Sequence, residues 1–411
     1  MAIVNSALDF LAQKLGHVVK YDSYGNPSWF VPIPKCTSKW LDDSLPDHIH
    51  PAFVVNGVVK DRVLIGKFKA CALIPGGPTY SIPGAPPLTA TGADAQLSQM
   101  RAFGSGQTGK TVADSGLILL YARKMGWVPK ANNNYSVDYR DGTPWTAGAS
   151  ISVGTKRVLH GWEYTALSAH TSAAENKPDI APSIWTKGKH IGGTPVLSQV
   201  SASVPNGYNT ITGSGPMSWN LGNNDHGVAG INELTGNCSE QDYGYRIFDG
   251  ELQILQDNNA ADPIADLSAG SAAWKAILPN LEDDGFTLVA PGTDGTLKWD
   301  VSAATGGYPI LDTVINIRTT ESASRSFKDL TRNVTNVPFV PHILLELGLF
   351  PISGDTTQGN VYVRNDAGSE FFPRRGGAYS STSSAGLGFE SCNYARSLAY
   401  TSYGARPRFS E

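Results

Sequence analysis

The sequence predicts an α+β fold that is rich in loops, with few helices and many short, mostly antiparallel strands. Three observations support this prediction. The 411 residues include 44 glycines and 26 prolines, which favour turns and loops. Few segments carry helical signals, and short strand-like runs alternate with polar loops between residues 130 and 230. Hydrophobic residues make up 41% of the chain, which is enough to fill a core.

Residues 1–50 and 51–411 are expected to form two parts of unequal size. A proline- and tryptophan-containing stretch, NPSWFVPIPKCTSKW, precedes the boundary that we expect near residue 50. The first part contains a short helix over residues 7–15, capped by Ser6. A helix this short is only marginally stable alone, so its leucine face needs a partner, either this chain or another copy. We therefore assign residues 1–50 to attachment or oligomerisation, and residues 51–411 to one large domain.

Turn and capping signals locate the other elements. The Val54-Val55 run reaches Asn56-Gly57, a strong signal for a two-residue hairpin turn. Further helices are expected from Asp114 or Ser115 to Gly126, around residues 268–278, and at residues 342–347.

Charge and cysteine content exclude several classes of protein. The net charge is −4 and no basic stripe occurs, so nucleic acid is not an expected partner. No apolar run approaches the ~18 residues that a membrane-spanning helix needs. The amino-terminal residues do not resemble a signal peptide. The four cysteines are isolated from one another, which predicts free, mostly buried thiols and synthesis in a reducing cytoplasm.

One segment, GSGQTGKT at residues 104–111, fits the phosphate-loop pattern letter for letter. A phosphate loop needs a buried strand before it and a helix after it, so that backbone amides surround the phosphate. A helix follows, but the preceding ADAQLSQMRAF segment does not read as a buried strand. A flexible glycine-rich loop is the favoured interpretation.

Candidate metal ligands are scattered. His48 and His50 lie near two aspartates, but a solvated linker is favoured over a metal site there. The runs at residues 132–134 and 223–225 offer side-chain oxygens that suit Ca²⁺, although asparagine and aspartate also stabilise turns. The Asp283-Asp284 pair is expected to face solvent on a loop. Residue spacing therefore predicts no catalytic residue and no bound metal.

The segment from residue 378 to 403 has an unusual composition. It contains seven serines, four tyrosines and two threonines, and only Glu390 and Arg396 are charged. Tyrosine offers a large contact surface with a polar end, and serine offers small adaptable contacts, as in antibody paratopes. Composition alone supports equally a binding surface and a polar β-hairpin with surface hydroxyls.

The residues that frame this segment are Arg375-Gly376-Gly377, Ala395-Arg396-Ser397 and Gly404-Ala405-Arg406-Pro407. They resemble the closing block of the C-type-lectin-like fold shared by formylglycine-generating enzymes and the variable proteins of diversity-generating retroelements. HGVAGINELTGNCSEQDYGYRIFDGELQI, residues 226–254, looks like an upstream block of that family. LILLYARKMGWVPKANNNYS resembles the preceding helix and its loop, and HPAFVVNGVVKDRVLIGKFKA the opening hairpin.

The resemblance covers residues 50 to 411, in order, with two departures. The family's Val-Trp-Glu-Trp is replaced by CSEQ, where only Asn237 just before it and Glu240 within it match. Some relatives bind calcium in this region, and here the flanking aromatic residues are missing, so no cofactor is expected, with bound calcium as the alternative. Residues 282–372 look like an insertion relative to the family.

Two functional branches share the fold, and the resemblance distinguishes them. The enzyme branch, a cysteine oxidase, needs a pair of reactive cysteines shortly after the Arg-Gly-Gly, because a thiolate must bind copper and meet the substrate thiol. Here residues 380–384 are serines and a threonine, and the next cysteine is Cys392. The resemblance therefore implies a protein that is not an enzyme.

In the variable-protein branch, adenine miscopying diversifies AAC codons, while the frame that folds stays constant. By this resemblance the display positions that bind ligand are Tyr379, Ser381, Thr382, Ser384, Gly388, Ser391, Asn393, Tyr394, Leu398, Tyr400 and Ser402. Glu390 is not reachable from AAC and is expected to be fixed. Leu387 and Phe389 are expected to face the core. The framing arginines Arg375, Arg396 and Arg406 are expected to be partly buried and bonded to backbone carbonyls.

The resemblance thus implies a phage receptor-binding or virion-surface protein, made in the host cytoplasm, with a hypervariable surface. Its partner would be a host-surface or other macromolecular ligand, and a homo-oligomer would suit the amino-terminal helix. The alternatives are a bacterial cell-surface protein, a cysteine oxidase of the same fold, and an undiversified structural virion protein.

Overall fold

The computed structural model describes residues 2–129, 137–138, 140–194, 196, 209–214, 230–280 and 285–411. Short strands outnumber helices in these ranges, and most strand pairs are antiparallel. The predicted α+β class with few helices is therefore confirmed. The runs at 132–134 and 223–225, the first residues of the 226–254 block, and Asp283-Asp284 lie outside the described residues.

Capping explains the best-defined helix. The α-helices in the described ranges are α1 (Ala2–Lys14), α2 (Ser38–Leu41), α3 (Ala93–Arg101), α4 (Val112–Met125) and α6 (His342–Glu346). At the start of α4, the Thr111 hydroxyl accepts from the Asp114 amide and the Asp114 carboxylate accepts from the Thr111 amide. The predicted cap at Asp114 is thus three residues late. Gly126, with φ of 71°, ends α4 as predicted.

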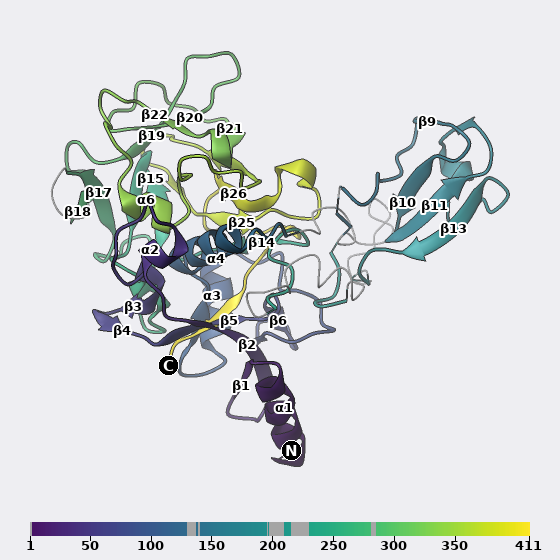
Figure 1. Cartoon of the computed structure of the whole chain (residues 1–411), viewed down its shortest axis with the longest axis horizontal. Coiled ribbons are helices and arrows are strands. Elements are labelled where there is room, and N and C mark those ends of the chain that lie inside the picture. The colour runs from purple at the N-terminus through teal and green to yellow at the C-terminus, as the bar shows by residue number, and fades with distance from the viewer. Residues whose placement is uncertain are drawn as a thin grey trace.

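Two other helix predictions had opposite outcomes. The helix predicted at 342–347 is α6. The helix predicted around 268–278 is wrong, because its apolar residues form strand β17 (Lys275–Pro279). This strand pairs with β16 (Glu251–Ile254) on one side and with β18 (Phe286–Val289) on the other, so sheet pairing overrides the helical pattern. Helix α1 begins at Ala2 and not at residue 7, so Ser6 lies inside it and is not its cap as predicted. It projects from the body in Figure 1, and Phe10, Leu11 and the following Leu15 are exposed.

The amino-terminal segment is built into a five-stranded sheet in the order β1-β2-β5-β28-β8. Its strands are β1 (Val18–Tyr21), β2 (Pro27–Pro34), β5 (Arg62–Gly66), β28 (Pro407–Phe409) and β8 (Gln107–Gly109). Strand β2 pairs along its length with β5, so residues on both sides of the boundary expected near residue 50 belong to one sheet. The predicted hairpin is confirmed as β3 (Val54–Val55) and β4 (Val58–Val59), and both of its turn residues have positive φ.

A six-stranded sheet in the order β21-β23-β26-β25-β14-β27 carries the carboxyl-terminal segment. Its strands are β21 (Ala323–Ser326), β23 (Asn360–Val363), β26 (Gly386–Cys392), β25 (Arg374–Gly376), β14 (Ser239–Gln241) and β27 (Tyr403–Gly404). The pairs β23·β26 and β14·β27 are parallel. Strands far apart in the sequence therefore meet around β26.

The third large sheet shows that the described part of the expected insertion, residues 285–372, is integral to the fold. It contains β15 (Tyr245–Phe248), β16, β17, β18, β19 (Lys298–Val301), β20 (Pro309–Asp312), β22 (Thr331–Arg332) and β24 (Glu370–Phe371). Trp299 and Leu311 from this region are buried in the main hydrophobic core. The expected insertion is thus not an appended unit, since it supplies strands to two sheets and residues to the core.

A small lobe stands apart from these sheets in Figure 1. It contains β9 (Ser150–Ile151), β10 (Lys156–Leu159), β11 (Trp162–Ala166), β12 (His170–Thr171), η3 (Ala174–Asn176) and β13 (Trp185–His190). Its own core includes Ile151, Tyr164 and Trp185. Short strands joined by polar loops were predicted here, and the described residues confirm them.

Helices α4 and α6 cross closely inside the main core. A Cβ on Gly116 of α4 would lie 2.0 Å from the carbonyl oxygen of Glu346, so the crossing needs glycine. The remaining short elements are η1 (Pro51–Phe53), β6 (Cys71–Ala72), β7 (Thr79–Tyr80), η6 (Asn259–Ala261), η7 (Phe327–Asp329) and η8 (Thr382–Ser384). In the described ranges, no helix is both long and apolar enough to cross a membrane. All four cysteines are free and three are buried, as predicted.

Candidate functional site

Residues 378–403 form two loops on either side of strand β26. Gly376 and Gly377 open the first loop with φ of 83° and 80°, which glycine adopts readily. A Cβ on Gly376 would also lie 2.4 Å from the Leu234 carbonyl oxygen. The first loop contains η8 and returns as β26, and the second loop leads to β27. The Asn237 carbonyl accepts from the Tyr379 amide at 3.0 Å and holds the first loop in place.

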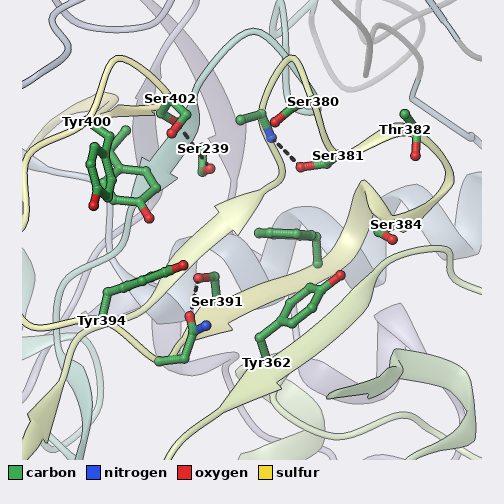
Figure 2. A pocket seen from close by; sticks show the side chains of 14 residues that line it. Ser239, Tyr362, Ser380, Ser381, Thr382, Ser384, Ser391, Tyr394, Tyr400 and Ser402 are labelled. Carbon is green, nitrogen blue, oxygen red and sulfur yellow. Dashed lines mark hydrogen bonds between the residues drawn. The ribbon is translucent and has the colours of Figure 1, made fainter. Parts of the chain in front are cut away.

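An open pocket of about 610 Å³ lies between these loops. Figure 2 shows hydroxyl groups and tyrosine rings around it. The lining residues are Ser239, Tyr362, Ala378, Ser380, Ser381, Thr382, Ser384, Phe389, Ser391, Asn393, Tyr394, Tyr400, Ser402 and Tyr403. None of these side chains is charged at neutral pH, so the pocket suits a ligand surface that is polar and aromatic rather than highly charged.

Eight of the eleven residues predicted from the resemblance line this pocket. They are Ser381, Thr382, Ser384, Ser391, Asn393, Tyr394, Tyr400 and Ser402. Tyr379 and Leu398 are half-buried and are not among the lining residues. The Tyr379 hydroxyl lies 3.1 Å from the hydroxyl of Thr401.

The prediction for Gly388 was wrong, because its position faces the core. A Cβ there would lie 2.7 Å from the Phe327 side chain. Strand alternation then turns Phe389 and Ser391 toward the pocket. Phe389 is buried as predicted, but it lines the pocket and is not part of the main core cluster. Leu387 packs against the main core as expected.

Some pocket residues were missed because they come from other parts of the sheet. Tyr362 lies on β23, where it pairs in parallel with Ser391 of β26. Ser239 lies on β14 beside Tyr403. The alternating sequence NVYV indicates a strand at 360–363, but it does not indicate which strand lies next to it. Ser380 and Ala378 flank predicted positions and are within the segment already singled out.

Tyrosine rings form one wall of the pocket over a buried arginine. The ring of Tyr403 lies 5.2 Å from that of Tyr400 and 5.8 Å from that of Tyr394, between centroids. The Arg374 guanidinium lies 4.0 Å from the centre of the Tyr403 ring, on the side of the core. Burial lowers the pKa of Arg374 and raises that of Tyr403. The cation–π contact offsets part of the cost of burying this arginine and fixes the position of the wall.

The pocket floor is held by short polar contacts. The Ser391 hydroxyl donates to the Asn393 side-chain oxygen at 2.6 Å, and Asn393 in turn donates to the Ser322 hydroxyl at 2.9 Å. In the first loop, the Ser381 hydroxyl accepts from the Ala378 amide at 2.9 Å. Some of the predicted display positions therefore stabilise the loops in which they lie.

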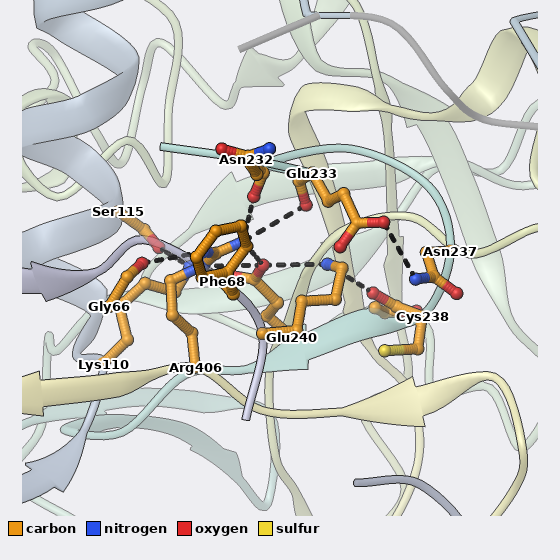
Figure 3. Close-up of polar contacts among 12 residues, drawn as sticks. Gly66, Phe68, Lys110, Ser115, Asn232, Glu233, Asn237, Cys238, Glu240 and Arg406 are labelled. Carbon is orange, nitrogen blue, oxygen red and sulfur yellow. Dashed lines mark hydrogen bonds and ion pairs between the residues drawn. The ribbon is translucent and has the colours of Figure 1, made fainter. Parts of the chain in front are cut away.

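Five buried charged residues form what we call the buried charge network: Lys69, Lys110, Glu240, Asp242 and Arg406. Glu240 lies on β14, in the six-stranded sheet that carries the pocket (Figure 3). Glu240 accepts from Lys69 at 2.8 Å and from Arg406 at 2.6 Å, and its other oxygen lies 3.0 Å from Lys110. Burial alone would raise the pKa of Glu240. The three cations outweigh burial and hold this pKa well below its ordinary value.

The framing arginines behave as predicted. Arg406 donates to the carbonyls of Gly66 and Asn232 at 2.8 and 2.7 Å. Arg375 donates to the carbonyl of Gly348 at 2.9 Å and pairs with Glu390 at 3.0 Å.

Arg396 is half-buried, and it bonds Glu370, Asp94 and the Leu267 carbonyl. Glu390, the residue expected to be fixed, is fully buried, and burial raises its pKa to about 7 although Arg375 opposes the shift.

The phosphate-loop pattern does not form a phosphate site. Residues 107–109 are strand β8 in the five-stranded sheet, so the flexible loop that we predicted is also wrong. The Lys110 ammonium is buried and pairs with Glu240 and with Asp242 at 2.9 Å. The cation that would meet a phosphate is therefore already neutralised within the protein.

The histidines near residue 50 are not in a solvated linker, which corrects the favoured prediction. His50 is fully buried, and its Nε2 lies 3.1 Å from the Glu346 carbonyl oxygen. His48 Nε2 lies 2.6 Å from the Glu346 carboxylate. The partners are 296 and 298 positions away, so no local pattern could identify them.

Cys392 points away from the pocket and into the core. Its thiol is fully buried and donates to the Phe371 carbonyl at 3.4 Å. Burial raises its pKa well above the ordinary value, which keeps it as an unreactive thiol. No cysteine is among the residues that line the pocket.

Comparison with known proteins finds no family model that matches the chain and no curated protein that is similar to it.

Proposed function

We propose that this protein is a non-enzymatic receptor-binding protein that engages a macromolecular ligand through the pocket between the two carboxyl-terminal loops. One observation carries the proposal. Eight positions chosen for their resemblance to diversified display positions line a single open pocket, whose wall is made of hydroxyls and tyrosine rings. Exposed tyrosines on a fixed backbone are suited to act as binding anchors.

The proposal includes a C-type-lectin-like fold and a surface varied by a retroelement, on a phage tail or virion. Support comes from the separation of roles within the segment. Arginines and glycines of the frame are buried or conformationally restricted, whereas most of the serines and tyrosines between them line the pocket. A cysteine oxidase is the weaker alternative, because the thiol of Cys392 is buried away from the pocket.

Binding to whole bacterial cells tests the function. Labelled protein is incubated with a panel of host candidates, and retention is measured for the parent, Tyr400→Ala and Tyr24→Ala. Tyr400 is 52% exposed at the pocket and Tyr24 is 76% exposed elsewhere, so Tyr24 is the matched control. We expect Tyr400→Ala alone to lose retention on the cell that the parent binds. Equal retention by both variants would contradict the proposal.

Sequencing the neighbouring DNA tests the diversification separately. We expect a reverse transcriptase gene and a near-copy of the codons for residues 378–403 that differs at adenines. A locus with neither would leave a binding protein whose pocket is not diversified.

A further inference from the structure

A cluster of two imidazoles and one carboxylate lies apart from the pocket. Glu346 Oε1 is 2.6 Å from His48 Nε2, and Glu346 Oε2 is 3.0 Å from His342 Nδ1. The three groups have ligand atoms that all lie within 4.8 Å of one another. His342 and Glu346 are four residues apart on α6, which places them on one face of the helix.

The backbone around this cluster is fixed from both sides. His48 is positioned by its carbonyl, which accepts from the Ser38 amide at 2.9 Å, and by the bridge between Thr37 and Ile49. His50 accepts the Ala52 amide at Nδ1, so its Nε2–H must donate to the Glu346 carbonyl. His50 thus fixes Glu346 through the Glu346 backbone carbonyl and not through the Glu346 carboxylate.

The burial of the three groups suits an ion that is reached from one side. The Glu346 side chain is fully buried, whereas those of His342 and His48 are 13% and 33% exposed. The two imidazoles that contact the buried carboxylate oxygens bind either a proton or a metal ion at the same nitrogen. Solvent reaches the His48 edge, where a water could complete the coordination.

We propose that His48, His342 and Glu346 bind a divalent transition-metal ion of the Zn²⁺ class. Two imidazole nitrogens and one carboxylate are a common zinc donor set, with bonds of about 2.0–2.2 Å and water in the fourth position. Tetrahedral bonds of that length place ligand atoms about 3.3 Å apart, so only small side-chain movements are needed. Imidazole donors favour Zn²⁺ or Co²⁺ over Ca²⁺ or Mg²⁺.

The ion would join the amino-terminal segment to α6, and through α6 to the pocket frame. Leu347 and Gly348, which follow α6, supply the carbonyls that accept from Arg375. Metal binding therefore stabilises the fold by linking His48 and Glu346, which are 298 positions apart. The metal needs no part in ligand recognition at the pocket.

The test uses the full chain, freed of metal with a chelator and then titrated with Zn²⁺, Co²⁺ or Ca²⁺ at pH 7.5. Calorimetry gives the stoichiometry and affinity, thermal melting reports stabilisation, and Co²⁺ absorption reports the coordination geometry. The variants are His48→Ala, which removes the most exposed donor, and His160→Ala. His160 is the matched control because it is half-exposed and lies 3.5 Å from the Asp179 carboxylate, outside the cluster.

We expect one equivalent of Zn²⁺, a raised melting temperature, and a four-coordinate Co²⁺ spectrum for the parent and for His160→Ala. His48→Ala should bind Zn²⁺ at least about tenfold more weakly and lose the spectrum. Ca²⁺ should have no effect. If the parent binds no Zn²⁺, or if His48→Ala binds as tightly as the parent, the cluster is only a hydrogen-bonded triad and the proposal fails. The Co²⁺ spectrum of the parent decides the matter even if the variant does not fold.

Discussion

The buried charge network and the pocket lie on the same part of the molecule but are built from opposite kinds of residue. Glu240 and its three cations are at most 4% exposed, and each is tied to a particular partner. The pocket has fourteen lining residues, none of them charged, and several face solvent with few contacts. The network therefore helps to specify the backbone, whereas exposed pocket side chains such as Tyr400 contribute little to it.

This difference has an energetic cause. Removing one partner of a buried ion pair leaves the others charged and desolvated, which is strongly destabilising. Shortening an exposed tyrosine removes little buried surface. A protein that must vary its binding surface can therefore do so only where side chains are neutral and exposed, and it must keep its charged groups in the frame. The following predictions would break or sharpen this contrast.

The largest effect is expected for Arg406→Met. Methionine fills similar volume but leaves Glu240 without its closest partner and the Gly66 and Asn232 carbonyls without a donor. We expect the free energy of unfolding in urea to fall by about 3–5 kcal/mol. Arg62→Met, at an exposed pair with Glu411, should cost less than about 1 kcal/mol. Equal losses would show that the network does not dominate stability.

A pH dependence is expected for Glu390, whose pKa is raised from 4.5 to about 7 by burial. Between these values the folded chain binds more protons than the unfolded chain, so stability falls as the pH rises. Relative to Glu390→Gln, which mimics the protonated acid, the parent should lose about 3 kcal/mol between pH 4.5 and 7. Urea unfolding of both proteins across this range provides the measurement. Parallel curves would contradict the raised pKa.

A smaller effect is expected for Gly388→Ala, which tests the correction to the display positions. The new methyl group would lie 2.7 Å from Phe327, so we expect a loss of about 1–3 kcal/mol from overpacking. Gly270→Ala is the control, because a Cβ there meets no atom within 4 Å. Thermal melting compares the two variants. If Gly388→Ala is neutral, the position is accessible to variation after all.

The smallest effect on stability is expected at the pocket wall. Tyr394→Ala and Tyr400→Ala, at side chains 37% and 52% exposed, should each change the free energy of unfolding by no more than about 0.5 kcal/mol. Binding to the cell that retains the parent protein should nevertheless weaken by about 2 kcal/mol or more for at least one of them. If a tyrosine variant lost as much stability as Arg406→Met, the tyrosines would belong to the residues that hold the fold together.

Local signals in the sequence predict local features well. The Asn56-Gly57 hairpin and the end of α4 at Gly126 depend on backbone preferences of the residues themselves. The segment around 268–278 was mispredicted because β16 and β18, which lie beside it, are defined by distant residues. Similarly, Tyr362 joins the pocket only through its pairing with β26. Composition singled out the segment that lines the pocket, but it did not indicate which face of β26 is turned toward the pocket.

The position of β28 has a consequence for synthesis of the protein. This strand lies inside the five-stranded sheet, between β5 and β8, and Arg406 just before it completes the charges around Glu240. The amino-terminal strands therefore remain an open sheet until residue 409 has left the ribosome. A premature stop codon anywhere in residues 378–403 would remove this closing strand. We expect such a chain to be degraded, because it lacks both the strand between β5 and β8 and the cation closest to Glu240.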